Sequence, residues 1–153
     1  MSTTENSNEL ELTDAIADRL LAADLRLVTA ESCTGGLIAA TLTELPGSSR
    51  WFEGAFVTYR LSAKTRMIGV SRDTLETFGA VSEPTARAMA EGALAASDAE
   101  VSIAVTGVAG PDGGVPGKPV GTVWFARALR RGAAIETIAR VQHFSGDREA
   151  VRR

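Results

Sequence analysis

The chain has 153 residues, of which 44% are hydrophobic and 23% are charged, and its net charge is −3. These proportions are typical of an ordinary globular domain, so they exclude a disordered chain, and the acidic balance argues against a protein that holds nucleic acid through its phosphates. One cysteine and one histidine exclude an intramolecular disulfide and a zinc site of the usual spacing.

The beginning of the chain lacks the features of a targeting signal. Residues 1–8 are polar and acidic, and we interpret them as a disordered leader. Nowhere do about eighteen apolar residues run together, so we expect a cytoplasmic protein. Apolar residues at helical spacing then predict an amphipathic helix over residues 9–23.

The next segments predict a strand, a turn and a helix. A short β-branched run favours a strand at 25–30, and the following glycine-containing turn leads into a helix at 37–45. Pro46 and Gly47 end this helix, and aromatic and β-branched residues favour a second strand at 51–59.

Three helices are predicted after the second strand. One covers residues 63–68 and ends at Gly69, and another begins after the N-cap Ser71 and stops at Gly79. The third opens with the order of hydroxyl, acid and proline that is typical of a helix start, and it covers residues 82–96.

The last part of the chain predicts three strands. A buried strand at 101–105 leads into a glycine-rich loop, and the strands at 122–128 and 135–141 form a hairpin. Helices that alternate with short apolar strands indicate a single α/β domain with three layers, α/β/α. The central sheet should be mixed, because the last two strands are joined too closely for a parallel crossover.

Ser32 is the first candidate for chemistry because it directly follows a predicted strand. A hydroxyl in this place lies close to the first amides of a helix, which can stabilise an oxyanion, and Gly35 and Gly36 would let a ligand approach the backbone. The alternative is that Ser32 or Thr34 only caps the helix. Cys33 competes as the nucleophile, but neighbours in extended chain point to opposite sides, and we favour Ser32.

Lys64 is the second candidate because lysine is rare in this chain. Of the sixteen cationic Lys and Arg residues, only Lys64 and Lys118 are lysines. Arginine does not release its proton in a protein, whereas burial can lower the pKa of a lysine until it acts as a base. Lys118 lies in a loop where solvent should keep it protonated, and Lys64 follows an apolar strand. The alternative is a solvated lysine on a short helix.

The third candidate is the loop TGVAGPDGG, which begins at Thr106. Successive amides and a hydroxyl at the end of a strand can hold a phosphate or a ribose. The loop matches neither the dinucleotide fingerprint nor the Walker motif, so a plain surface loop is the alternative. Near the end, Arg148 offers a bidentate phosphate contact, or else it belongs to a capped helix start and is solvated.

Several motifs stand in an order that resembles the CinA C-terminal domain family, nearly from end to end. They are AESCTGG, GSSRWFEGAFVTY, Lys64, GAVSEP, TGVAGPDGG, KPVGTVWFA and FSGDREAVRR. Stand-alone members of this family are nicotinamide-nucleotide amidohydrolases, and this chain resembles those because no further domain precedes Glu9. The resemblance implies one domain over residues 9–153 and hydrolysis of nicotinamide mononucleotide to nicotinate mononucleotide and ammonia, in pyridine nucleotide salvage.

The resemblance also implies roles for individual residues. Ser32 matches the serine of the family, Lys64 its lysine and Tyr59 its tyrosine, and these three are the expected catalytic residues. The expected substrate contacts are Thr34, Gly35, Gly36, Ser48, Thr106, Gly107, Gly110 and Arg148. Of these, Thr106 and Arg148 are expected at the nucleotide phosphate. We expect no cofactor or metal, no nucleic acid or membrane partner, and a homo-oligomer.

The implied mechanism is that of a serine-lysine amidase. Neutral Lys64 takes the proton of Ser32 as the hydroxyl attacks the carboxamide carbon, and amides of the following turn stabilise the oxyanion. Lys64 or Tyr59 then protonates the leaving ammonia. Trp51, Phe52 or Tyr59 would bind the cationic ring by cation–π contact, unless they belong to the core.

Two other functions and two departures from the family pattern complete the expectations. A non-catalytic nucleotide-binding or regulatory module keeps the same pocket, and a serine-lysine peptidase leaves Thr106 and Arg148 without a role. Leu61 stands where family members commonly have asparagine. The chain also stops at Arg153, where they tend to continue with an amphipathic helix, so apolar surface could be exposed.

Overall fold

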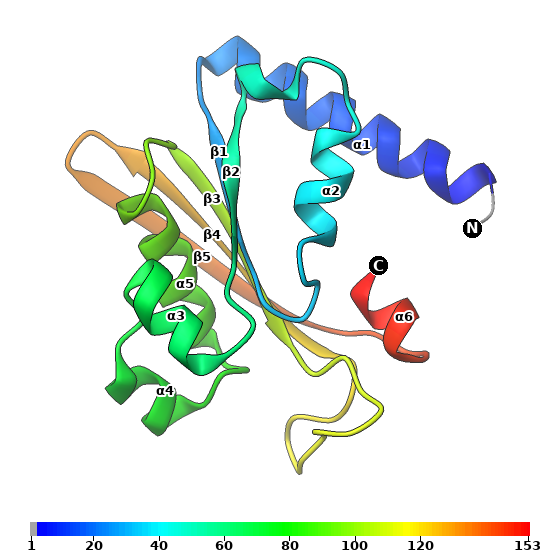
Figure 1. Ribbon diagram of the computed structural model, residues 1–153, viewed down its shortest axis with the longest axis vertical. Helices are drawn as coiled ribbons and strands as arrows, with labels where there is room; N and C mark the ends of the chain where they lie inside the picture. Colours follow the sequence, from blue (N-terminus) through cyan, green and yellow to red (C-terminus); the bar gives the residue numbers. More distant parts are fainter. Residues whose placement is uncertain (1–2) are drawn as a thin grey trace.

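The computed structural model describes residues 3–153, in which helices and strands alternate as far as the second strand, three helices follow, and three strands and a last helix complete the chain (Figure 1). The strands are β1 (Leu27–Glu31), β2 (Phe52–Val57), β3 (Val101–Gly107), β4 (Thr122–Arg131) and β5 (Ala134–His143). The helices are α1 (Thr3–Ala23), α2 (Leu37–Thr43), α3 (Leu61–Ile68), α4 (Arg72–Phe78), α5 (Glu83–Ala95) and α6 (Arg148–Arg152), with a short 3₁₀ turn, η1 (Ser48–Arg50).

The strands form one mixed sheet in the order β2-β1-β3-β4-β5. β1 runs parallel to β2 and to β3, while β4 is antiparallel to both β3 and β5. Helices α1 and α2 cover one face, and α3, α4 and α5 cover the other (Figure 1). The predicted α/β class with a mixed central sheet is therefore confirmed.

Local capping explains where the helices on the second face begin and end. Ser71 and Ser82 are the N-caps of α4 and α5, and each hydroxyl accepts a hydrogen bond from an amide three residues later. Gly69 ends α3 in the left-handed conformation. These three boundaries are those that the sequence predicts.

Helix α1 starts earlier than expected. It begins at Thr3 rather than at Glu9, so residues 3–8 differ from the disordered leader that the sequence suggests, while residues 1–2 lie outside the described range. Residues 3–8 contain neither glycine nor proline, and extending an existing helix adds a backbone bond per residue without a new nucleation cost.

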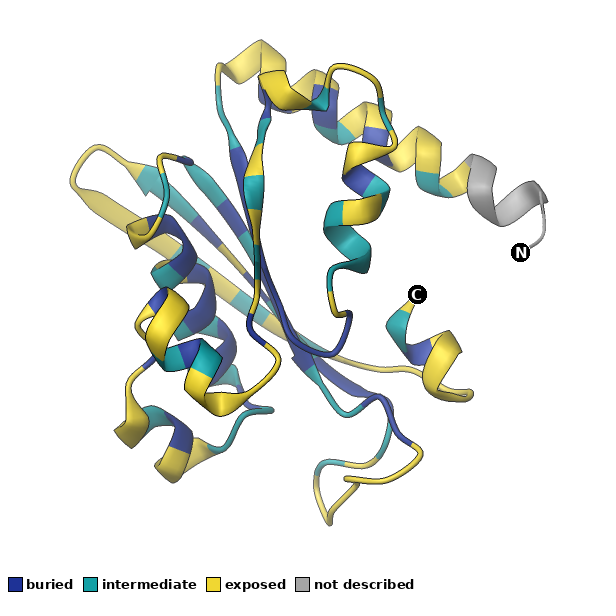
Figure 2. Ribbon diagram, in the orientation of Figure 1, coloured by how far each residue is buried: buried dark blue, intermediate teal, exposed yellow. Residues whose placement is uncertain are grey.

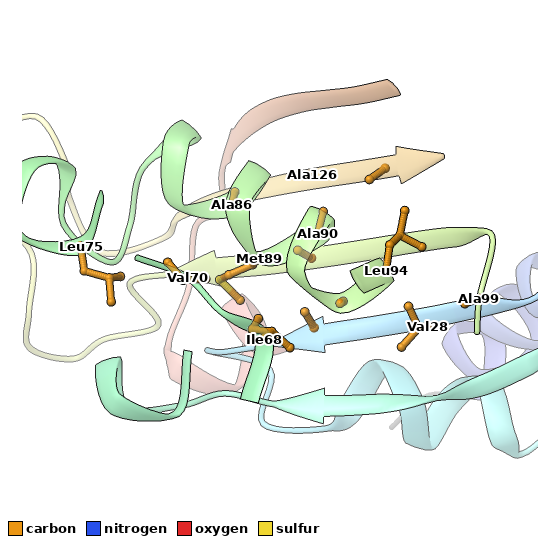
Figure 3. Packing of buried hydrophobic residues seen from close by; sticks show 14 residues of the cluster. Val28, Ile68, Val70, Leu75, Ala86, Met89, Ala90, Leu94, Ala99 and Ala126 are labelled. Atoms are coloured by element: carbon orange, nitrogen blue, oxygen red, sulfur yellow. The ribbon is translucent and has the colours of Figure 1, made fainter. Parts of the chain in front are cut away.

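β1 is buried on both of its faces, and its side chains alternate between two clusters. Val28 and Ala30 belong to the core beneath α5 (Figure 3), whereas Leu27 belongs to the core beneath α1 and α2. Because side chains alternate along a strand, Ser32 continues the face of Ala30 and Glu31 continues the face of Leu27. The end of β1 therefore sends one polar side chain to each side of the sheet.

Burial falls across the sheet from β1 and β3 to the edge strand β5 (Figure 2). On the side of α1 and α2, the face of β3, β4 and β5 carries apolar side chains that solvent reaches, among them Ile138, which is 50% exposed. None of the described helices is both long enough and apolar enough to span a membrane.

Candidate active site

A pocket of about 290 Å³ opens where β1 and β3 end. Ligands of open α/β sheets bind outside the carboxyl ends of the strands, because the loops that follow the strands diverge there. The residues that line the pocket are Ser32, Cys33, Tyr59, Lys64, Ala80, Val81, Thr106, Gly107, Val108, Ala109, Gly110, Asp112, Gly113 and Arg148.

The side chains of Ser32 and Lys64 meet in this pocket. Lys64 Nζ lies 2.9 Å from Ser32 Oγ, and it also donates to the carbonyl oxygens of Thr58 at 2.6 Å and of Tyr59 at 3.4 Å. A neutral amine has two hydrogens and one lone pair. The two carbonyls can take both hydrogens, which leaves the lone pair for the Ser32 hydroxyl to donate to.

Burial tunes Lys64 for this arrangement. Its side chain is fully buried, and this burial lowers the pKa of Lys64 to about 8. Desolvation disfavours the charged form of an amine, so about one tenth of Lys64 is neutral at pH 7 and about half at pH 8. Lys118, by contrast, donates to the carbonyl of Phe78 in an exposed contact.

The inward direction of Lys64 follows from the packing of α3. Lys64 and Ile68 are one helical turn apart and are the buried residues of this helix, so both lie on its inner face. Ile68 packs into the core beneath α5. The two helices approach closely at Gly92 of α5, where a Cβ atom would overlap the carbonyl oxygen of Ile68. A glycine at position 92 thus lets α3, the helix that carries Lys64, pack this closely against α5.

Cys33 lines the same pocket but is a weaker candidate nucleophile. Burial raises the pKa of the Cys33 thiol, which keeps it protonated and therefore less reactive. The side chain packs against Val123 and Val151, beside α6. The preference for Ser32 over Cys33 rests on this environment and on the contact with Lys64.

The turn after Ser32 differs from the expectation. The Gly35 amide donates to the carbonyl of Ser32 at 3.1 Å, and the Gly36 amide and the Thr34 hydroxyl donate to the carboxylate of Glu31 at 2.9 and 2.7 Å. Thr34, Gly35 and Gly36 are absent from the pocket lining in the described chain. The structure places them in the turn, where internal acceptors take the hydrogens of the Thr34 hydroxyl and of the Gly35 and Gly36 amides.

Ser48, another expected substrate contact, does not line this pocket. It lies in η1, before β2, and β2 must run through its six residues before the chain reaches the pocket. At about 3.3 Å per residue this separates Ser48 from the pocket by roughly 20 Å.

Trp51 is 1% exposed in the core beneath α1 and α2, and Phe52 packs against the same core. Of the three expected aromatic contacts, therefore, Tyr59 alone lines the pocket.

Thr106 and Arg148 both lie in the pocket, but they differ in whether they have hydrogens left to donate to a ligand. The Thr106 hydroxyl donates to the carbonyl of Ala80 at 2.7 Å, so its hydrogen is not available to a phosphate. Arg148 donates to the carbonyl of Gly110 at 2.8 Å and to the Tyr59 hydroxyl at 2.9 Å. A guanidinium has five N–H groups, and so Arg148 keeps donors for a ligand. It follows the N-cap Asp147 at the start of α6.

The sequence interpretation missed several residues around the pocket. Ala80 and Val81 line it from the loop before α5, and Asp112 lines it from the glycine loop. The GAVSEP segment contains the first two, but nothing in their chemistry marks them as functional. Arg152 donates to the carbonyls of Cys33 and Thr34 at 3.0 and 3.2 Å and so ties α6 to the turn.

Leu61 does not lie in this pocket. It lines a separate groove beside α3 and α4, with Thr65 and Leu75. Within the described chain, therefore, having leucine instead of asparagine at position 61 does not remove a polar side chain from the pocket of Ser32 and Lys64.

Comparisons with known proteins give the geometry a context. The model of the CinA C-terminal domain family matches residues 9–153. The Escherichia coli K12 protein named nicotinamide-nucleotide amidohydrolase PncC is 51% identical over 148 residues, which cover 97% of this chain and 88% of that protein. A CinA-like protein of Akkermansia muciniphila is 51% identical over 142 residues, which cover 93% of this chain and 34% of that protein. The crystal structure of competence damage-inducible protein A (ComA) from Klebsiella pneumoniae matches with a TM-score of 0.88 and 42% identity, covering 94% of this chain and 87% of that one.

Proposed function

The chain belongs to the CinA C-terminal domain family, and on this basis we propose that it is an amidohydrolase that converts nicotinamide mononucleotide to nicotinate mononucleotide and ammonia. The proposal joins the name of a relative with 51% identity to the chemistry of the pocket. The observation that supports it most is the distance of 2.9 Å between Ser32 Oγ and a buried Lys64 Nζ.

The first half of the reaction forms an acyl-enzyme. Neutral Lys64 takes the hydroxyl proton of Ser32 as Oγ attacks the carboxamide carbon, and the carbonyl oxygen of the substrate becomes an oxyanion. When the carbon–nitrogen bond breaks, the ammonium group of Lys64 returns the proton to the leaving nitrogen. Ammonia departs, and nicotinate mononucleotide remains as an ester of Ser32.

The second half consumes one water. Lys64, neutral again, takes a proton from the water as its oxygen attacks the ester carbon, and Ser32 Oγ leaves and recovers the proton. The sum is one amide and one water in, and one acid and one ammonia out. The carbonyls of Thr58 and Tyr59 hold the amine in place through both halves.

The glycine loop offers donors for the oxyanion, beside the amide of Cys33 that directly follows Ser32. The amides of Gly35 and Gly36 are engaged within the turn, and the Val108 amide donates to the carbonyl of Thr122. No acceptor in residues 3–153 engages the amides of Ala109 and Gly110, which belong to the pocket-lining loop. Each such donor typically contributes about 3 kcal/mol in acyl-transfer enzymes.

The nucleotide part of the substrate fits the side of the pocket near α6. Arg148 is a cation there with spare N–H groups, which suits the phosphate, and Tyr59 is an aromatic ring beside it, which suits a cationic pyridine. Because Arg148 donates to the Tyr59 hydroxyl, that hydroxyl keeps its own hydrogen for the substrate.

The test is ammonia release from nicotinamide mononucleotide, measured beside free nicotinamide and the dinucleotide. We expect the mononucleotide to be hydrolysed fastest, with nicotinate mononucleotide as the product. Acid-quenched samples should carry the acyl group on Ser32 by mass spectrometry, and the Ser32→Ala variant should carry none.

Two controls separate the outcomes. Cys33→Ala should keep more than about half of the activity, because the thiol is not the nucleophile in this scheme. Calorimetric binding of the mononucleotide without ammonia release from any of the three compounds would refute the hydrolase and favour a nucleotide-binding module.

A further inference from the structure

We propose that Glu31 is a positioning residue for Ser32: its buried carboxylate fixes the turn that carries the nucleophile and so keeps the hydroxyl against Lys64. The proposal rests on the proposed role of Ser32. It assigns a function to a charged group that the reaction itself does not use, since the Glu31 side chain leaves the strand on the face opposite to Ser32.

Glu31 is a fully buried carboxylate that accepts hydrogen bonds only. The donors are Thr29 Oγ1 at 3.2 Å, Thr34 Oγ1 at 2.7 Å, Gly36 N at 2.9 Å, Ile38 N at 3.1 Å and Ala39 N at 2.8 Å. Three of these donors are backbone amides, which can only donate, and together they reach both oxygens of the carboxylate. Among residues 3–153 no cation pairs with it.

The partners show what this anion does. The first amides of a helix have no acceptor within the helix, and the side chain of the N-cap residue usually provides one. Here the N-cap is Gly36, which is left-handed and offers no side chain. Glu31 takes over the cap from five residues upstream, where the positive end of the helix also favours an anion.

A helix cap from five residues upstream holds more of the chain in place than a cap at the N-cap position itself. Serine or aspartate at position 36 would satisfy the helix alone, whereas the bonds of Glu31 span the whole turn from the end of β1 to the start of α2. The Thr34 hydroxyl and the Gly36 amide, which belong to the turn, and the Ala39 amide, which belongs to the helix behind it, all donate to the Glu31 carboxylate. Ser32 lies inside this closed loop.

The backbone of Glu31 completes the link to the base. Its carbonyl accepts from the Thr58 amide at 2.8 Å, and the Thr58 carbonyl in turn accepts from Lys64 Nζ. On the other side, the Ser32 amide donates to the carbonyl of Val105 at 3.1 Å. Glu31 therefore holds both partners in place. Its carboxylate fixes the turn that carries the Ser32 hydroxyl, and its carbonyl, through Thr58, fixes the amine of Lys64.

Two hydroxyl deletions provide a matched test. Thr34→Val and Thr29→Val each remove one hydroxyl donor from the Glu31 carboxylate, but Thr34 lies in the turn and Thr29 lies in the strand before it. Neither residue lines the pocket. If Glu31 positions the turn, kcat should fall about tenfold in Thr34→Val and less than about twofold in Thr29→Val, with KM within about threefold in both.

Glu31→Gln is the stronger perturbation. It places an NH₂ group against an amide or hydroxyl donor and removes the charge, so we expect kcat to fall about 100-fold with little change in KM, as for a displaced catalytic group. The rate at which Ser32 reacts with a small fluorophosphonate should fall in parallel, since this rate does not depend on the nucleotide. The midpoint of thermal unfolding shows whether each variant still folds.

The outcomes separate the positioning role from the proposed function. Equal effects of the two threonine variants on kcat, or an unchanged labelling rate of Ser32 in Glu31→Gln, would overturn the proposal. If Glu31→Gln does not fold, the threonine pair decides. A wild-type protein that labels at Ser32 but releases no ammonia would refute the function alone, and slower labelling in Thr34→Val than in Thr29→Val would still support positioning. Absence of both reactions in the wild type would overturn both.

Discussion

The pH dependence of hydrolysis tests the role of Lys64 directly. With a pKa of about 8, set by burial, Lys64 acts as a base only in its neutral form. The neutral share is about one tenth at pH 7, about half at pH 8 and about nine tenths at pH 9. Below about pH 7, therefore, kcat/KM should rise about tenfold per pH unit; it should rise about fivefold between pH 7 and 8 and level off above pH 9.

The assay is ammonia release from nicotinamide mononucleotide at constant ionic strength, with stability checked at each pH. Lys64→Arg keeps the positive charge but cannot lose the proton, and it should lower kcat by about 10²–10⁴-fold, the usual contribution of a general base. The midpoint should stay near the pKa of about 8 in Cys33→Ala, because burial is the main cause of the shift.

A flat profile between about pH 7 and 9 would refute this reasoning, since no other group in the proposed mechanism titrates as the base there. Retention of the wild-type rate in Lys64→Arg would do the same, because a guanidinium stays protonated.

Four further predictions follow from the geometry. Since the pKa of Lys64 falls from 10.5 unfolded to about 8 folded, the unfolded chain binds more protons between these values; stability should therefore rise with pH by about 3 kcal/mol relative to Lys64→Met in urea titrations. Gly92→Ala should lower the stability by about 1–3 kcal/mol by calorimetry, because its Cβ overlaps the carbonyl of Ile68. Arg148→Ala should raise KM for the mononucleotide about tenfold or more, without a comparable change for free nicotinamide, in steady-state assays. Ser48→Ala should leave kcat/KM within about twofold, and a larger loss would show that our placement of Ser48 outside the site is wrong.

Local sequence rules predicted the elements well because the determinants are local. The caps Ser71 and Ser82 and the left-handed Gly69 act within one turn of the helices they delimit. Lys64 was identifiable for a chemical reason, since the chain has only one other lysine and arginine cannot serve as the base.

The positions and contacts of the other candidate residues depend on parts of the chain that are distant in the sequence. Thr106 looked like a free hydroxyl at a strand end, but its acceptor is Ala80, 26 residues earlier. Ser48 belongs to a motif that continues into the site, yet the length of β2 places it at the opposite end of the strands from the pocket. Glu31 had no assigned role because capping rules look for an acceptor at Gly36 or next to it, not five residues upstream.

The two-sided end of β1 has a consequence for how this protein can change over evolutionary time. Ser32 and Glu31 point to opposite sides because the pleat alternates, so inserting or deleting one residue within β1 would exchange their directions. The hydroxyl would then meet the amides of α2, and the carboxylate would meet Lys64. A substitution at Ser32 or Glu31 changes one of these side chains, but a change in the length of the strand would disable the nucleophile and its support in one step.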